Sequence, residues 1–403
     1  MNEPSVFGGP EQTMPKDAVH AGSWEHRDLH NLYGFYQHKA TVEGLVCRSG
    51  GSERPFTLSR SFFSGSQRLG AVWTGDNVAS WDYLKISIPM LLSLNVAGIC
   101  FCGADVGGFD RAPGPELLVR WYQAGALQPF FRGHSATWTP RREPWLLGDQ
   151  VTAAIRSAVR QRYCLLPYWY TVFRQAHCSA LPVLRPLWVE FPEEPNTFAV
   201  DDQYLIGGAL LARPVTDPGA TEVNVALPGS SEIWYDVVSA TAYRGGETLR
   251  LPVTMDTVPL FQRGGTVVTR TTGCGSCTAD LQLWPLAVTL ALDANGVAVG
   301  DLYLDDGHTF RYRDNNAFCL LTFNLSPHRL FCCSAGGQVE LDCGRVVQTV
   351  IILGRKSEPS SVTLHAAGQE VVACVFQYEE ERAVLTVGNL NLQVGRDWEI
   401  RLD

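Results

Sequence analysis

Four side chains capable of acid, base or binding chemistry follow four successive apolar runs in the first third of the sequence. They occur in the order Arg60 after residues 55–58, Asp76 after 70–73, Asp105 after 97–101 and His134 after 128–131. Carboxyl groups can donate protons or attack electrophilic carbon, while Arg and His can hold hydroxyl groups or charge. The spacing therefore predicts one polar site assembled from several strand ends.

Each of these residues has an ordinary structural explanation when it is taken alone. Asp76, in a Trp-Thr-Gly-Asp-Asn stretch, could cap a helix, and the glycines around Asp105 could simply form a turn. The His could be structural and the Arg a surface cation. As a set, flanked by Trp73 and Phe109, they supply what cleavage of a glycosidic bond needs: a proton donor, a carboxylate and groups that grip hydroxyls.

The elements that would position this set are parallel strands alternating with helices over about the first 180 residues. Helices are expected at residues 116–122 and after Asp149, which is placed to cap the second one, and Pro167 should end or kink that helix. Four parallel strands make half of a (β/α)₈ TIM barrel. They could equally make a small open α/β sheet, and the pattern leaves both possibilities open.

The pattern changes near residue 182. Short runs of β-branched and aromatic residues then alternate with Gly, Pro, Asn and Asp turns, which indicates β-sandwiches. Residues 271–280 are typical of a linker. The predicted fold class is α/β followed by all-β, with a half-barrel over residues 1–181, a proximal β-sandwich over 182–270 and a distal β-sandwich over 271–403.

Composition excludes several classes of function. A net charge of −9 and a pI near 5.5 argue against a nucleic-acid partner, and no apolar stretch is long enough for a membrane span.

Of the twelve cysteines, Cys100 and Cys102 lie in an apolar run and are expected to be buried thiols, whereas Cys274 and Cys277 form a lone C-x-x-C. The Asp-Asp-Gly-His stretch at 305–308 is expected to be a turn. No metal or cofactor is predicted.

Several long stretches resemble glycoside hydrolase family 31, and within it the neutral α-glucosidase and glucosidase II catalytic-subunit type. The stretches are MNEPSVF, RSFFSGSQ, AVWTGDN, GADVGGF, LLVRWYQAGALQPFFRGH, REPWLL, RPLWVEFP, DDQYLIGGALL, PLFQRGG and LYLDDGHTF. The resemblance implies that residues 1–181 are the C-terminal half of the catalytic barrel.

The resemblance also implies roles for individual residues. Asp76 matches the family's catalytic acid/base, and the positions that match its −1 sugar subsite are Arg60, Trp73, Asp105, Phe109 and His134. The family's nucleophile, the Asp of W-x-D-M-N-E, would stand directly before Met1. The expectation is therefore a C-terminal portion without the N-terminal domain, half the barrel and the nucleophile, inactive by itself.

The function implied for the longer protein is that of a retaining α-glucosidase acting on terminal α-linked glucose of oligosaccharides or N-glycans. A non-catalytic partner subunit of the glucosidase II kind, and a place in the endoplasmic reticulum lumen or the cytoplasm, are further implications. Two alternatives stay open. One is a non-enzymatic carbohydrate-binding or assembly module from a short isoform, and the other is an α-xylosidase or glucan lyase of the same family.

Overall fold

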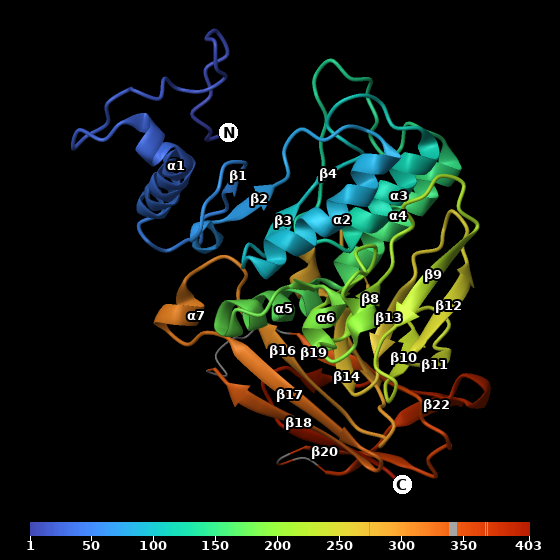
Figure 1. Cartoon of the computed structure of the whole chain (residues 1–403). Coiled ribbons are helices and arrows are strands. Elements are labelled where there is room, and N and C mark those ends of the chain that lie inside the picture. The colour runs from blue at the N-terminus through green and yellow to red at the C-terminus, as the bar shows by residue number, and fades with distance from the viewer. Residues whose placement is uncertain (274, 338–344, 367, 369) are drawn as a thin grey trace.

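The computed structural model describes residues 1–273, 275–337, 345–366, 368 and 370–403. The first 180 residues alternate strands and helices, and the remainder is almost entirely strands (Figure 1). The elements of the first part are α1 (His26–Arg48), β1 (Leu58–Ser59), β2 (Ala71–Trp73), α2 (Trp81–Val96), β3 (Cys102–Gly103), β4 (Asp105–Val106), α3 (Pro115–Ala126), β5 (Arg132–Gly133), α4 (Asp149–Cys164) and α5 (Leu166–Ser179).

The strands of this part are parallel, as a half-barrel requires. β1 pairs with β2, β2 pairs with β3, and β4 pairs with β5, all in parallel register. The helices α2 and α3 lie along one side of these strands (Figure 1). This pairing is what the predicted half-barrel requires. Two strands begin later than the apolar runs suggested, so that Asp105 lies on β4 and Arg132 lies on β5 rather than in loops.

The helix boundaries correct one expectation and confirm another. Asp149 is the first residue of α4 and makes no capping hydrogen bond, whereas Gly148, with φ 93°, is the cap residue. A glycine reaches this backbone conformation without strain, so the helix starts without a side-chain cap. Pro167 lies in the first turn of α5 after α4 has ended, where its missing N–H costs no hydrogen bond.

The segment after residue 182 forms two sheets that face each other. A six-stranded sheet has the order β11-β10-β13-β8-β7-β6, and β12 pairs with β9 in a second sheet. Trp234 and Phe261 are fully buried between them, in one core with Val225. The strands are β6 (Leu184–Arg185), β7 (Tyr204–Ile206), β8 (Leu210–Ala212), β9 (Glu222–Leu227), β10 (Ile233–Asp236), β11 (Ala242–Arg244), β12 (Glu247–Pro252) and β13 (Leu260–Arg263), and the helix between β6 and β7 is α6 (Leu187–Glu190).

The last part is one large, mostly antiparallel sheet system that folds around its own core. Phe323 and Trp398 belong to that core, and alternate residues of β17 are buried as a strand with one inner face requires. In the described residues its strands are β14 (Thr266–Thr271), β15 (Leu286–Ala291), β16 (Ala298–Leu304), β17 (Cys319–Ser326), β18 (Arg329–Gly336), β19 (Val346–Leu353), β20 (Val362–Ala366), β21 (Val372–Ala373), β22 (Val375–Glu379), β23 (Val384–Gly388), β24 (Leu392–Gln393) and β25 (Trp398–Leu402), with the short helix α7 (Arg311–Asp314) after β16. β14 spans the predicted boundary between residues 270 and 271.

The half-barrel rests on this distal part through α5, which packs on β14 and β16. The backbone N–H of Tyr303 donates to Thr171 Oγ1 at 3.0 Å. Asp305, which is almost wholly buried, accepts from Tyr170 Oη at 2.5 Å and from Arg54 Nη2 at 3.1 Å. These contacts join the distal part to the half-barrel.

The Asp-Asp-Gly-His stretch at 305–308 forms a turn, as the sequence predicts. Asp306 accepts hydrogen bonds from the backbone N–H groups of His308 and Thr309, as a turn-forming carboxylate does. Cys274 of the C-x-x-C pair lies outside the described residues. Cys102 is buried, as expected, whereas Cys100 is only half-buried. No helix in the described part of the chain is both long and apolar enough to cross a membrane.

Candidate active site

Asp76 and Arg60 meet at the carboxyl ends of two neighbouring barrel strands. Asp76 follows β2 through Gly75, whose φ of 89° and missing Cβ let the Arg60 side chain approach closely. Arg60 Nη1 donates to Asp76 Oδ1 at 3.1 Å, and its Nε donates to Glu3 Oε1 at 2.5 Å. The Asp76 side chain is 52% exposed and so open to a substrate. One guanidinium thus bridges two carboxylates from different segments.

Glu3 was not singled out from the sequence. Its neighbour Asn2 is buried and fixes the segment, because Asn2 Nδ2 donates to Gly34 O at 2.9 Å and to Ser61 O at 2.8 Å. Ser61 N in turn donates to Asn2 Oδ1 at 3.0 Å. Burial alone would raise the pKa of Glu3, but the hydrogen bond and charge of Arg60 outweigh it and lower that pKa. Glu3 lies in the MNEPSVF stretch that carries the family resemblance, and that resemblance is the signal that could have identified it.

Asp105 and Arg132 form a second ion pair across the β4–β5 register. Arg132 Nη2 lies 2.5 Å and Nε 3.1 Å from Asp105 Oδ1, and Asp105 is fully buried. Its Oδ2 finds no hydrogen-bond partner among the described residues. Burial raises the pKa of Asp105, and the hydrogen bonds and charge of Arg132 offset this only in part. Arg132 was missed in the sequence because its apolar run was expected to extend to residue 131 and the loop to begin after it.

Trp73 joins the two ion pairs. The guanidinium carbon of Arg60 lies 5.8 Å from a ring centroid of Trp73, and that of Arg132 lies 5.3 Å away. Cations at this distance from an indole are attracted by the ring quadrupole. Trp73 is itself nearly buried at the end of β2, so it provides a fixed apolar wall between the two pairs.

Phe109 and His134 lie beside each other on the next two loops, with ring centroids 5.5 Å apart. The buried Asn77, next to Asp76 in the chain, fixes the first of these loops. Its Nδ2 donates to Asp105 O at 3.1 Å and its Oδ1 accepts from Phe109 N at 2.8 Å. Asn77 thereby connects the loop of the predicted acid to the loops of the predicted binding residues.

Arg142 holds the Phe109 and His134 loops together. Its guanidinium donates to the carbonyl oxygens of Gly107, Gly108, Phe109 and Arg111 on one loop and to that of His134 on the other. Burial lowers the pKa of Arg142. Neither this residue nor Asn77 was identified from the sequence, because both act on backbone groups that are distant in sequence.

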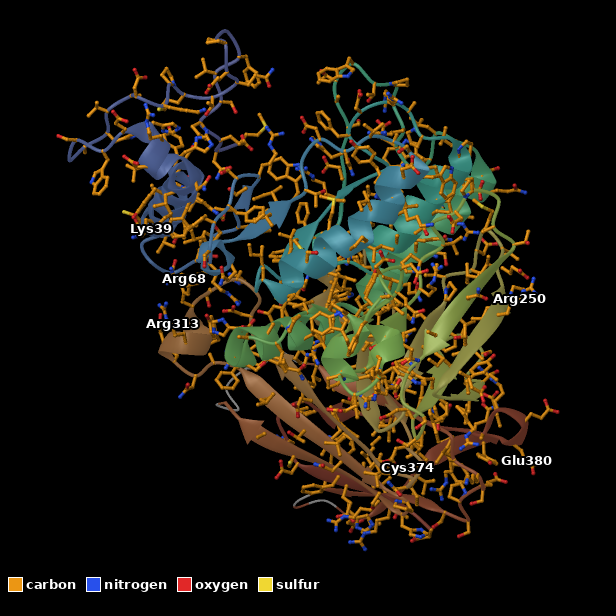
Figure 2. All side chains as sticks on the ribbon, in the orientation of Figure 1. Lys39, Arg68, Arg250, Arg313, Cys374 and Glu380 are labelled. Carbon is orange, nitrogen blue, oxygen red and sulfur yellow. The ribbon has the colours of Figure 1, made fainter. Side chains whose placement is uncertain are left out.

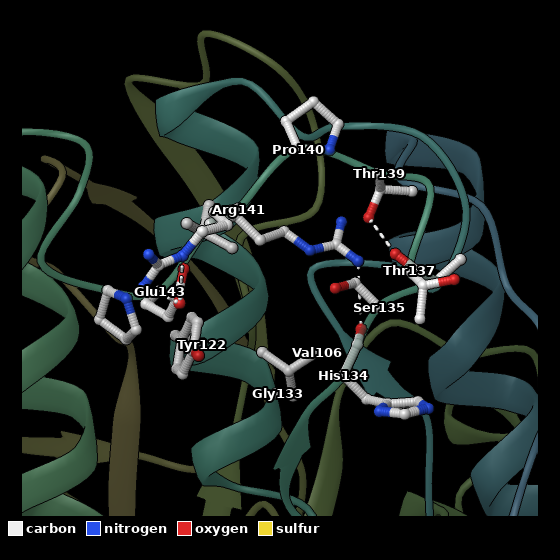
Figure 3. A pocket seen from close by; sticks show the side chains of 14 residues that line it. Val106, Tyr122, Gly133, His134, Ser135, Thr137, Thr139, Pro140, Arg141 and Glu143 are labelled. Atoms are coloured by element: carbon white, nitrogen blue, oxygen red, sulfur yellow. Dashed lines mark hydrogen bonds and ion pairs between the residues drawn. The ribbon is translucent and has the colours of Figure 1, made fainter.

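A hollow of about 550 Å³ is lined by His134 and the residues that follow it, among them Ser135, Thr137 and Thr139, together with apolar side chains such as Val106 and Leu118. Figure 3 shows the ring of His134 pointing away from Arg141 and Glu143, which form an ion pair on the other side of the hollow.

Through the ion pairs, ring contacts and hydrogen bonds described above, the six predicted site residues belong to one connected network at the strand ends. Within the residues that the structure describes, no cluster of three His, Cys, Asp or Glu side chains could hold a metal ion.

The fold agrees with known proteins, and these matches confirm the predicted half-barrel rather than the small open sheet. Residues 1–172 match the family model of the glycosyl hydrolases family 31 TIM-barrel domain, and residues 180–268 match that of the glycosyl hydrolase family 31 C-terminal domain. Neutral alpha-glucosidase C of Mus musculus is 55% identical over 404 residues, covering 100% of this chain and 45% of the relative. Neutral alpha-glucosidase AB of Mus musculus is 53% identical, covering 100% of this chain and 42% of the relative.

Among solved structures, the glucosidase II alpha subunit in its Glc1Man2-bound form superposes with a TM-score of 0.95 at 40% identity. The match covers 100% of this chain and 46% of the solved chain, so the sequence spans a little under half the length of the three proteins just named. Both family models occur in order along the chain, and the similarity to these relatives extends over all of it. The chain belongs to glycoside hydrolase family 31.

Proposed function

We propose that the protein is a retaining α-glucosidase in which Asp76 is the acid/base. The observation that carries the proposal is the placement of Asp76: half-exposed at the carboxyl end of β2 and held by Arg60, within the site network. A proton donor for a glycosidic oxygen must be reachable by substrate and fixed in direction, and Asp76 meets both conditions. The names and high identities of the relatives support the same activity.

The remaining residues have roles that follow from their contacts. Asp105 is fully buried, so its role is to position Arg132, which donates to its Oδ1 from Nη2 and Nε and is itself partly exposed toward a sugar hydroxyl. Trp73 and Phe109 supply apolar surfaces against which the faces of a sugar ring can pack, and His134 closes the site beside Phe109.

The proposed substrates are oligosaccharides or N-glycans with a terminal α-linked glucose. Relatives with the names neutral alpha-glucosidase C and AB are 55% and 53% identical, and a probable glucan 1,3-alpha-glucosidase of Oryza sativa subsp. japonica is 44% identical. A solved structure of the glucosidase II alpha subunit is described as Glc1Man2-bound. These names support a glucosyl group as the transferred unit.

A non-catalytic partner subunit is part of the proposal. A structure of an ER glucosidase II heterodimeric complex, consisting of a catalytic subunit and the binding domain of a regulatory subunit, matches this chain with a TM-score of 0.95. Affinity purification of the protein at its natural expression level, followed by mass spectrometry, tests this part. If no second chain copurifies in stoichiometric amount, the proposal of a partner subunit is rejected, while the proposed activity is unaffected.

The experiment on activity uses the protein expressed from its complete gene, because retention also requires a second, attacking carboxylate. Hydrolysis of an α-1,3- or α-1,4-linked glucose disaccharide is followed by ¹H NMR during the first minutes. The expected first product is α-glucose, which then mutarotates. β-Glucose as the first product would refute retention. Sugar binding without turnover would favour the non-enzymatic carbohydrate-binding alternative.

A further inference from the structure

Trp138 is a large apolar side chain that is left in solvent beside the site. It is 73% exposed, although it lies on the same loop as His134. Its neighbours Thr137 and Thr139 line the hollow beside the site, but Trp138 is not part of that lining. Its indole instead makes an edge contact with Phe109, with ring centroids 6.0 Å apart and an interplanar angle of 88°. The indole is thus directed toward the site rather than into the hollow.

The exposed indole is nevertheless fixed in position. Its Nε1 donates to Asp110 Oδ1 at 3.2 Å, and its ring contacts Phe109, so that two separate contacts hold the indole. A side chain that is already ordered loses little conformational entropy when a ligand packs on it. An indole face is therefore presented to solvent in one orientation, which suits a binding platform.

The anchor of Trp138 places it on the side of the acid. Asp110 N donates to Asn77 O at 2.9 Å, and Ala79 N donates to Asp110 O at 2.8 Å. Asn77 directly follows Asp76 in the chain. Trp138 is thus two contacts away from the proton donor, through Asp110 and Asn77. In glycoside hydrolysis the acid protonates the oxygen of the leaving sugar, so this is the side on which that sugar lies.

We propose that Trp138 is the stacking platform for the sugar on the leaving-group side of the bond to be cleaved. The C–H face of a pyranose packs on the exposed face of the indole, while the indole N–H stays bound to Asp110. Trp138 thereby selects substrates in which a sugar, rather than a small group, is attached to the terminal glucose. This inference rests on the proposed function, because it requires Asp76 to face the leaving group.

The test compares two substrates that differ only in the leaving group: a glucose disaccharide and α-glucosyl fluoride, whose fluoride cannot stack. The protein expressed from its complete gene is compared with Trp138→Ala, Trp138→Phe and, as a matched control, Trp145→Ala at another exposed tryptophan (65% exposed). For the disaccharide, Trp138→Ala is expected to lower kcat/KM about tenfold, or ~1.4 kcal/mol, mainly through KM. Trp138→Phe should lower kcat/KM for the disaccharide less than Trp138→Ala does, and Trp145→Ala should leave it unchanged.

Hydrolysis of α-glucosyl fluoride by Trp138→Ala should match that of the unchanged protein. Equal losses on both substrates would mean that Trp138 merely supports the loop, and no loss on either would mean that no sugar packs there; each result overturns the inference.

In a second measurement, inhibition by a thio-linked glucose disaccharide should weaken in Trp138→Ala while inhibition by deoxynojirimycin does not. If the unchanged protein hydrolyses neither substrate, the proposed activity itself fails. Undiminished inhibition by the thio-disaccharide in Trp138→Ala would still refute the platform.

Discussion

Arg132 and Asp105 form an ion pair between adjacent parallel strands, with Arg132 Nη2 2.5 Å from Oδ1 of a carboxylate that solvent does not reach. A pair of this kind is not a simple source of stability, because the Asp105 carboxylate loses its hydration and that of Arg132 is reduced. Its importance lies in what happens when one partner is removed. The other charge would then remain buried without compensation.

Replacing Arg132 by Met should therefore lower the free energy of unfolding by about 3 kcal/mol, as expected when one partner of a buried pair is removed. Urea titration followed by tryptophan fluorescence measures the effect. The matched control is Arg250→Met. Arg250 forms a surface ion pair with Glu222 on the proximal sandwich, where Figure 2 labels it, and its side chain is 73% exposed. That change should cost less than about 1 kcal/mol. Similar losses of unfolding free energy in both variants would show that breaking the Arg132–Asp105 pair costs no more than breaking a surface pair.

Replacing Asp76 by Ala should remove the proton donor and leave the substrate-binding residues in place. We expect kcat to fall by about 10²–10⁴-fold for a disaccharide, whose leaving group needs a proton. The loss should be much smaller for an activated aryl α-glucoside, which leaves without one. Added azide should then accelerate turnover and yield α-glucosyl azide, detectable by mass spectrometry and NMR. Equal losses on both substrates, with no azide product, would assign the acid to another residue.

Arg142 acts on the site through backbone groups, because its guanidinium donates to carbonyl oxygens on the Phe109 and His134 loops. Replacing Arg142 by Met should therefore disturb the site without removing a contact to substrate. Small displacements of binding groups are costly in catalysis, and we expect kcat/KM to fall by about tenfold or more. Arg142→Lys should recover only part of this, since one ammonium cannot reach all the carbonyls. The control is Arg141→Met, which alters an exposed ion pair with Glu143. If Arg142→Met matches that control in KM and kcat, the loops do not depend on Arg142.

Replacing Asp306 by Asn should produce a stability loss that depends on pH. Burial raises the pKa of Asp306, but hydrogen bonds from Thr309 and His308 outweigh it and bring the pKa to about 2. A folded pKa below the unfolded value means that the carboxylate stabilises the fold above about pH 4 and loses this contribution as the pH falls toward 2. The expected loss in Asp306→Asn is about 2 kcal/mol at pH 7.

Urea titrations at pH 7 and pH 3 measure this difference, which should shrink at the lower pH. Asp17→Asn, at an exposed position, is the control and should show no loss at either pH. An Asp306→Asn loss that is the same at both pH values would mean that the effect comes from shape rather than charge.

The sequence by itself determined the alternation of strands and helices and the residue types near the strand ends, although not the exact strand bounds. The apolar runs and the loops after them located Asp76 and Asp105, and the resemblance in the same stretches indicated the chemistry. Local rules also predicted the break at Pro167, because a missing N–H acts within one helical turn. They failed at Asp149, because a glycine with φ 93° starts that helix instead.

Only the tertiary structure decided which side chains meet. Arg132 pairs with Asp105 because β4 and β5 are in a particular parallel register, and no local pattern encodes that register across an intervening helix. Arg60 reaches Glu3 across 57 residues, and Trp138 is fixed on the acid's side through Asp110. Periodicity and turn signals act over a few residues, whereas these contacts depend on how distant strands close the half-barrel.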